Sequence, residues 1–151
     1  MLKKTINYTD LNGNEQKTTR YFNLTKSEIV KLENSVKGGF TVMLRHALAT
    51  GDSPVVMEGI EKLILSSYGE KSADGQSFIK FRVENGARIS LADEFMQTPA
   101  YDALFMELLT DDNASDAFMR GVIPSDMAKQ LPANIKEALP EELQDMLAEE
   151  N

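Results

Sequence analysis

The sequence predicts a mainly α-helical domain that opens with a β-hairpin and ends in a flexible acidic tail. Three observations support this fold class. β-Branched and aromatic runs flank a turn near the N-terminus, apolar residues recur at helical spacing further along, and prolines and acidic residues gather at the end. At 151 residues the chain can form one domain with its own core. We place the helical domain at residues 1–124, with its hairpin at about 3–23, and the acidic, weakly ordered tail at 125–151.

The hairpin is predicted from two runs that suit strands and from the turn between them. Residues 5–8 and 17–22 are rich in threonine, isoleucine, tyrosine and phenylalanine, which favour extended backbone. Asn12 and Gly13 lie between the runs, and both residue types tolerate the positive φ of a tight hairpin turn. An antiparallel pair of strands is therefore expected before any helix.

The first helix has the clearest start in the sequence. Thr25 and Glu28 have the spacing of a capping box, in which the hydroxyl and the carboxylate each accept from a free backbone N–H group. Leu24 and Ile29 stand at the two positions of a hydrophobic staple. A helix is thus expected from about residue 26.

Two more helices are expected before residue 69. Gly38-Gly39 separates the second helix from the first, and Gly51 closes it. Ser53 is expected to cap the third helix, with Pro54 at its first position, where a missing N–H costs nothing. The apolar stripes of these helices are Phe40, Met43, Leu44, Ala47 and Leu48 in the second and Val56, Ile60, Leu63 and Ile64 in the third.

The stretch from 70 to 89 is the least regular part of the domain. Gly69 is expected to end the third helix, and Asn85-Gly86 predicts a turn. Residues 78–81 could form a short strand or a helical turn, and the residue pattern leaves both open. Ser90 resembles an N-cap, so a helix should resume near residue 91.

Residues 95–124 carry much of the apolar and aromatic material. Pro99 should open a helix, the acidic residues at 111 and 112 should break it, and a short helix should run from about 114 to 120. Five apolar side chains share one face of the first of these helices: Tyr101, Leu104, Phe105, Leu108 and Leu109. Apolar residues flank this stripe on other faces, so the helix is either central to the fold or partly offered to another chain.

The net charge of −8 is concentrated near the C-terminus. Residues 1–106 carry 13 basic and 13 acidic side chains, whereas residues 107–151 carry 3 basic and 11 acidic ones. An acidic surface repels phosphate backbones, so nucleic-acid binding is disfavoured. The acidic third is either a solvated face and tail or an electrostatic contact for a basic partner. Neither a secretory signal nor a run of about 18 apolar residues is visible, so we expect a cytoplasmic protein without membrane association.

Residues that could carry chemistry are scarce. The chain has no cysteine, and His46 is its single histidine, so neither a metal site nor a proton relay is expected. Two segments, starting at Asp10 and at Asp111, resemble the start of a calcium loop but lack its glycine and glutamate. Adjacent acids such as Asp93 and Glu94 suit helix starts rather than catalysis. We therefore predict no enzyme activity, no metal and no cofactor.

Three stretches of the sequence also carry a family resemblance. They are FNLTKSEI, EGIEKLILSSYGEKSADGQSFIK and FMQTPAYDALFMELLTDDNASDAFMRGVIP. In this order they resemble the tail assembly chaperones of long-tailed phages and prophages of Gram-positive bacteria, over roughly residues 1–125. The resemblance implies a small, acidic, mostly helical protein without catalytic residues.

The resemblance further implies a function and its partners. Such chaperones coat the aggregation-prone tape measure protein, and a C-terminally extended form made by ribosomal frameshifting recruits tail tube subunits. They act in the cytoplasm of the infected or lysogenic bacterium and are absent from the mature virion. Self-association is a further expectation. Two alternatives stay open: a structural head–tail connector or tail terminator, and a small regulatory protein that binds a host factor.

The candidate partner-binding residues come from the apolar segment. We expect these side chains either to build the binding face or to support it from the core. They are Tyr101, Leu104, Phe105, Leu108, Leu109 and Phe118.

Overall fold

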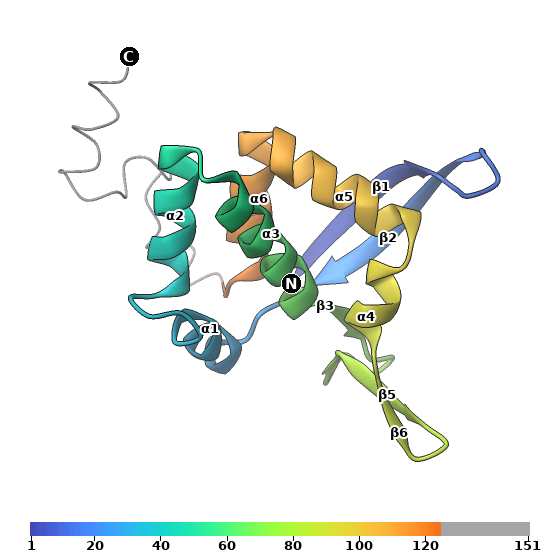
Figure 1. Ribbon diagram of the computed structural model, residues 1–151. Helices are drawn as coiled ribbons and strands as arrows, with labels where there is room; N and C mark the ends of the chain where they lie inside the picture. Colours follow the sequence, from blue (N-terminus) through green and yellow to red (C-terminus); the bar gives the residue numbers. More distant parts are fainter. Residues whose placement is uncertain (125–151) are drawn as a thin grey trace.

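The computed structural model describes residues 1–124, which fold into a mixed α/β domain (Figure 1). About half of these residues are helical. The strands form a four-stranded antiparallel sheet in the order β1-β2-β3-β4 and a separate two-stranded sheet, β5-β6. The predicted acidic tail, residues 125–151, lies outside the described residues, so its weak order stays a prediction.

The predicted N-terminal hairpin is confirmed. Strands β1 (Leu2–Thr9) and β2 (Glu15–Phe22) pair in register over their full length. Gly13 has a φ of +82°, as the turn requires, and the Asp10 carboxylate accepts hydrogen bonds from two backbone N–H groups of the turn. Side chains alternate along β1, with Ile6 buried and its neighbours Thr5 and Asn7 exposed, so one face of the hairpin is covered by the helices.

Helix α1 (Lys26–Glu33) begins at the predicted capping box. The Thr25 hydroxyl accepts from the Glu28 N–H at 3.2 Å, and the Glu28 carboxylate accepts from the Thr25 N–H at 3.0 Å. Leu24 is buried in the core, and Ile29 packs against the same core, as the staple positions predict.

The two predicted helices are present as α2 (Phe40–Thr50) and α3 (Ser53–Ser67), which pack against each other. Gly51 ends α2 in the left-handed conformation. The cap of α3 differs by one residue from the prediction, because Ser53 is already helical and Asp52 is the N-cap. Gly59, in the middle of α3, lets Leu44 of α2 approach closely, since a Cβ atom there would lie 2.6 Å from Leu44 Cδ1.

The prediction that Gly69 ends the third helix is wrong. Helix α3 ends at Ser67 and the chain passes directly into β3 (Tyr68–Lys71), which pairs with the end of β2. Strand β4 (Phe78–Ile79) pairs with β3 on the other side. Gly69 is required by this close approach, because a Cβ atom there would lie 2.5 Å from Phe78 Cε1 and 2.6 Å from the Ile79 carbonyl oxygen.

Strands β5 (Phe81–Glu84) and β6 (Ala87–Ser90) form a second hairpin, which projects from the body of the domain (Figure 1). Asn85 and Gly86 form its turn, as predicted, with φ values of 52° and 78°. Residues 78–81, for which the sequence left two possibilities, are extended apart from the single residue between β4 and β5. Every residue of β5 is exposed.

Three helices complete the domain. They are α4 (Leu91–Met96), α5 (Pro99–Thr110) and α6 (Asp112–Val122). Each begins at a capping side chain, Ser90, Thr98 and Asp111 respectively. Helix α6 is longer than predicted, because Asp111 accepts from two backbone N–H groups and starts the helix directly after α5.

An aromatic cluster joins distant parts of the chain in the core. The Phe22 ring at the end of β2 lies 5.0 Å from the Phe118 ring and 5.6 Å from the Tyr68 ring, both edge-to-face. Tyr68 stacks on Phe95, with ring centroids 4.2 Å apart. The cluster therefore ties the N-terminal hairpin, the end of α3, α4 and α6 into one core.

The fold class must be corrected from mainly α to mixed α/β. The helices and the N-terminal hairpin are present, but β3 and β4 extend that hairpin into a sheet and β5-β6 adds a second one. These four strands are two to four residues long, too short to show an alternating pattern. In addition, β3 pairs with the distant end of β2, which local sequence does not reveal.

Candidate partner-binding surface

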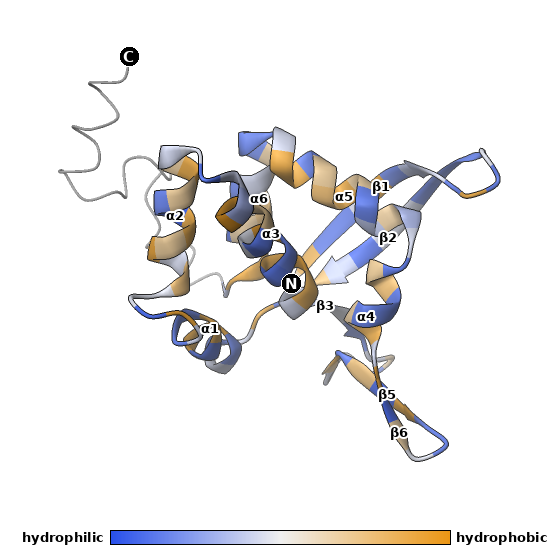
Figure 2. Cartoon of the chain, viewed as in Figure 1, coloured by the Kyte–Doolittle hydropathy of each residue, from blue (hydrophilic) through white to orange (hydrophobic). Residues whose placement is uncertain are grey.

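Helix α5 has one buried side and one partly exposed side. Ala100, Leu104 and Leu108 are buried, and Leu104 has no exposed surface at all. Tyr101, Phe105 and Leu109 are half-buried, and all three pack against the core. Met106, on the outer side, is 47% exposed. Figure 2 shows apolar residues along much of this helix.

Local sequence and packing against three elements hold α5 in place. The Thr98 hydroxyl accepts from the Tyr101 N–H, and Pro99 lies in the first turn. The helix packs against β1, α3 and α6. A salt bridge of 2.8 Å joins Lys4 Nζ of β1 to Glu107 Oε1 of α5. The side chains of α5 therefore stand on a fixed support.

Helix α5 packs against α3, which also packs against α2. On α3, Gly59 meets α2, and helical spacing puts Met57 and Glu61 on the side of α3 opposite Gly59. Burial raises the pKa of the Tyr101 hydroxyl on α5, and the charge of Glu61 raises it further, as expected for neighbouring side chains. Met57 is 43% exposed, and Glu61 is exposed. We call these side chains, where the two helices meet, the α3–α5 seam: Met57, Glu61, Tyr101, Phe105 and Leu109.

Tyr101 lies at the centre of the seam. Its ring is 5.8 Å from the Phe95 ring in the core and 6.1 Å from the Phe105 ring nearer the surface. The pKa of its hydroxyl is raised, first by burial and then by the carboxylates of Glu61 and Asp102. The seam thus combines aromatic surface with nearby negative charge.

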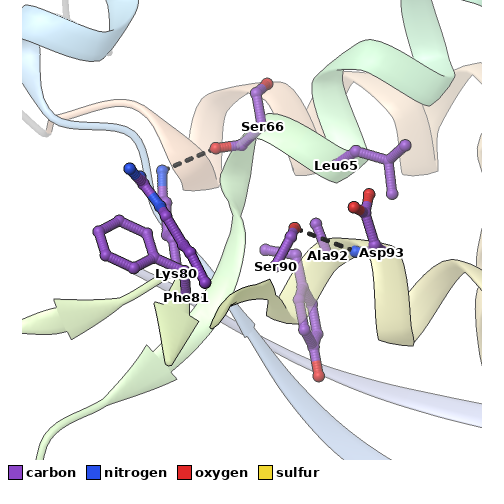
Figure 3. A pocket seen from close by; sticks show the side chains of 9 residues that line it. Leu65, Ser66, Lys80, Phe81, Ser90, Ala92 and Asp93 are labelled. Atoms are coloured by element: carbon purple, nitrogen blue, oxygen red, sulfur yellow. Dashed lines mark hydrogen bonds between the residues drawn. The ribbon is translucent and has the colours of Figure 1, made fainter. Parts of the chain in front are cut away.

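A cavity of about 410 Å³ lies where the second hairpin meets the body of the domain (Figure 3). Several polar groups that line it form hydrogen bonds or a salt bridge within the domain. Lys80 Nζ donates to the Ser66 carbonyl oxygen at 2.7 Å and forms a salt bridge with Glu28. The Ser90 hydroxyl accepts from the Asp93 N–H, and Arg88 lies 3.5 Å from the centre of the Phe81 ring. This arrangement anchors the hairpin, and no activated nucleophile lines the cavity.

Residues 1–124 hold neither a cluster of metal-binding side chains nor a membrane-spanning helix. No group of three histidine or acidic side chains in this range could hold a metal ion. The Asp10 carboxylate, at the start of the calcium-like segment, caps its turn, and hydrogen bonds from Asn14, Gln16 and Asn12 lower its pKa. His46 is exposed on α2. No helix in the described range is long and apolar enough to cross a membrane.

Comparison with known families identifies the wider group. A profile of the family described as phage tail assembly chaperone matches residues 1–151. The chain belongs to the phage tail assembly chaperone family. Neither a search of curated proteins nor one of solved structures finds a significant match. The family is non-enzymatic, so the chaperone acts in virion assembly by binding tail proteins rather than by catalysis.

The six candidate residues lie in two environments in the folded chaperone. Leu104, Leu108 and Phe118 are buried, and Phe118 lies in the aromatic core on α6. Tyr101, Phe105 and Leu109 lie together on the α3–α5 seam. Sequence reasoning missed the α3 side of the seam. Met57 and Glu61 are one helical turn apart beside the apolar stripe of α3, but only tertiary packing brings them next to α5.

Proposed function

We propose that this chaperone binds the tape measure protein of its phage, keeps it soluble, and helps to recruit tail tube subunits. The α3–α5 seam carries the proposal, because it presents half-exposed aromatic and methionine side chains on packed helices. A longer form made by frameshifting would contact the tail tube protein. The site of action is the cytoplasm of the host bacterium, and the chaperone leaves before the virion is mature.

The proposed contact has a simple physical basis. A tape measure protein is expected to expose long apolar helical stripes, and such stripes aggregate when they meet. Tyr101 and Phe105 are held against the core and are only half-buried. Their remaining exposed surface can therefore cover part of such a stripe without any rearrangement of the domain. The exposed side chains of Met57 and Met106 are flexible and adapt to irregular apolar surfaces. Many modest contacts of this kind bind the partner and still permit its release.

The six candidate residues then divide into two roles. Tyr101, Phe105 and Leu109 touch the partner. The other three hold the binding helix in place from the core: Leu104, Leu108 and Phe118.

Co-expression with the tape measure protein of the same genome tests the proposal. We expect a soluble complex that contains several copies of the chaperone per tape measure chain. Phe105→Ala should weaken the complex, because it removes an aromatic side chain from the seam. Phe81→Ala is the control: it removes the same aromatic side chain from the second hairpin, away from the seam, where Phe81 is 44% exposed.

Circular dichroism of both variants separates binding loss from unfolding. If the two folded variants bind equally well, the seam is not the contact surface. If the tape measure protein stays insoluble with the wild-type chain, the tape measure role is wrong and a virion component becomes the next hypothesis to test.

A further inference from the structure

The α3–α5 seam has a charged border as well as an apolar centre. Glu61 lies on the α3 side, and Asp102 follows Tyr101 on α5; both side chains are exposed. Within residues 1–124 neither carboxylate forms a salt bridge. Asp102 directly follows Tyr101 on α5, and Glu61 lies on α3, which packs against α5, so both carboxylates border the aromatic surface. Besides burial, their charges also raise the pKa of the Tyr101 hydroxyl.

Lysines on and beside these helices make their contacts elsewhere. Lys62, next to Glu61, donates to the Ser35 hydroxyl at 2.7 Å and lies 5.8 Å from the Phe40 ring, on the side of α1 and α2. Lys4 is paired with Glu107, on the β1 side of α5. The negative charge at the seam is therefore not neutralised by the domain itself.

The spacing of the apolar side chains indicates the shape of the partner. Tyr101, Phe105 and Leu109 are four residues apart and form a ridge along α5. Such ridges pack against the grooves between side chains of another helix. The seam offers side chains rather than a free strand edge, so an added β-strand would gain no backbone hydrogen bonds there.

We propose that the seam takes an amphipathic helix whose apolar stripe is bordered by lysine or arginine, with those cations against Glu61 and Asp102. This inference rests on the proposed function and describes the chemistry of the segment that the chaperone covers. An apolar helix with acidic borders would meet like charge and be rejected. The border thus selects among the apolar stripes of a long partner.

Two synthetic helical peptides test the inference on the full chain. They share one pattern of leucines, and one carries lysine borders where the other carries glutamate. Fluorescence anisotropy should show that the lysine peptide binds about tenfold or more tightly than the glutamate peptide at low salt. The difference should shrink at about 0.5 M salt, because exposed charges are then screened.

Charge variants locate the effect. Glu61→Gln with Asp102→Asn should weaken the lysine peptide by about three- to tenfold, as expected for two exposed ion pairs. The control, Glu15→Gln with Glu70→Gln, removes the same net charge from exposed positions on the sheet and should leave the affinity unchanged. Glu61→Lys with Asp102→Lys should reverse the preference toward the glutamate peptide, with an unchanged circular dichroism spectrum.

The results of the peptide and solubility experiments distinguish a failure of this inference from a failure of the proposed function. Suppose that the wild-type chain solubilises the tape measure protein but binds both peptides alike, or that the seam and control variants behave alike. The charge-selective border is then wrong, while the proposed function stands. If the chain does not solubilise the tape measure protein, both proposals are overturned.

Discussion

Gly69 shows how a single residue joins the helices to the sheet. A methyl group added at Gly69 would meet the Phe78 ring and the Ile79 carbonyl oxygen. That oxygen belongs to the backbone, so it cannot rotate away. Gly59 is also crowded, but the atom that it faces is the tip of the Leu44 side chain, which can turn. The two glycines therefore differ in whether their surroundings can yield.

Gly69→Ala should destabilise the domain by about 1–3 kcal/mol more than Gly59→Ala. The first change overpacks a rigid junction. The steric cost of Gly59→Ala is partly offset by the better helix propensity of alanine, about 1 kcal/mol within a helix. Urea denaturation of both variants measures the difference, and equal losses would show that β4 can move away from β3.

Glu28 should make stability depend on acid pH. Burial raises the pKa of its carboxyl, but hydrogen bonds from Lys80 and from the Thr25 N–H, together with the charge of Lys80, outweigh burial and lower the pKa overall. A lowered pKa in the folded state contributes stability above the unfolded value. That contribution is lost as the pH falls through the folded pKa.

Glu28→Gln should therefore cost about 1 kcal/mol at pH 7, through the lost cap and ion pair. The difference from wild type should shrink toward zero as the pH falls through the lowered pKa of the folded Glu28 carboxyl, because the wild-type side chain then becomes protonated. Thermal melts between pH 3 and 7 measure this. The matched control is Glu15→Gln, at an exposed strand position, and a pH-independent deficit in Glu28→Gln would contradict the linkage.

At the scale of elements, sequence patterns predicted those structures that local interactions define. The capping box at Thr25, the cap at Ser90, the helix start at Pro99, and the turns at Gly13 and Gly86 each depend on residues a few positions apart. The short strand β3 depends instead on the end of β2, more than 40 residues away, and β4 in turn pairs with β3. Gly69 was misassigned for the same reason, since its close neighbours come from a different strand.

Helices α5 and α6 should respond differently to the loss of an aromatic ring. Phe118 is only 2% exposed and packs edge-to-face on Phe22, so Phe118→Ala should cost about 3–5 kcal/mol. Phe105 is half-buried, so Phe105→Ala should cost clearly less and leave a folded protein suitable for binding studies. Urea unfolding measures both, and similar losses would mean that the seam is part of the core.

Over the whole molecule, the sequence predicted only the α5 part of the candidate surface and not the α3 part. One helix was predicted to offer an apolar stripe, and the structure separates that stripe into buried and half-exposed members. The neighbouring α3 side chains and their charge enter only through tertiary packing. The whole net charge of −8 belongs to residues 107–151, yet Glu61 and Asp102 lie in the balanced part of the chain, where a charge count does not predict a local acidic border.

The modest size of the seam leads to a prediction about the finished particle. The half-buried side chains of the seam have little further surface to remove from water, so under the proposed function each contact with the tape measure protein would be weak. Tail tube subunits that polymerise around the tape measure protein would bury far more surface in total and should displace the chaperone. Quantitative mass spectrometry should therefore find it with the tape measure protein in infected-cell lysates, at several copies per chain, and deplete it from purified virions. Retention in virions at a fixed ratio to the tube protein, together with closed rings of the isolated chain, would instead identify a structural component of the tail.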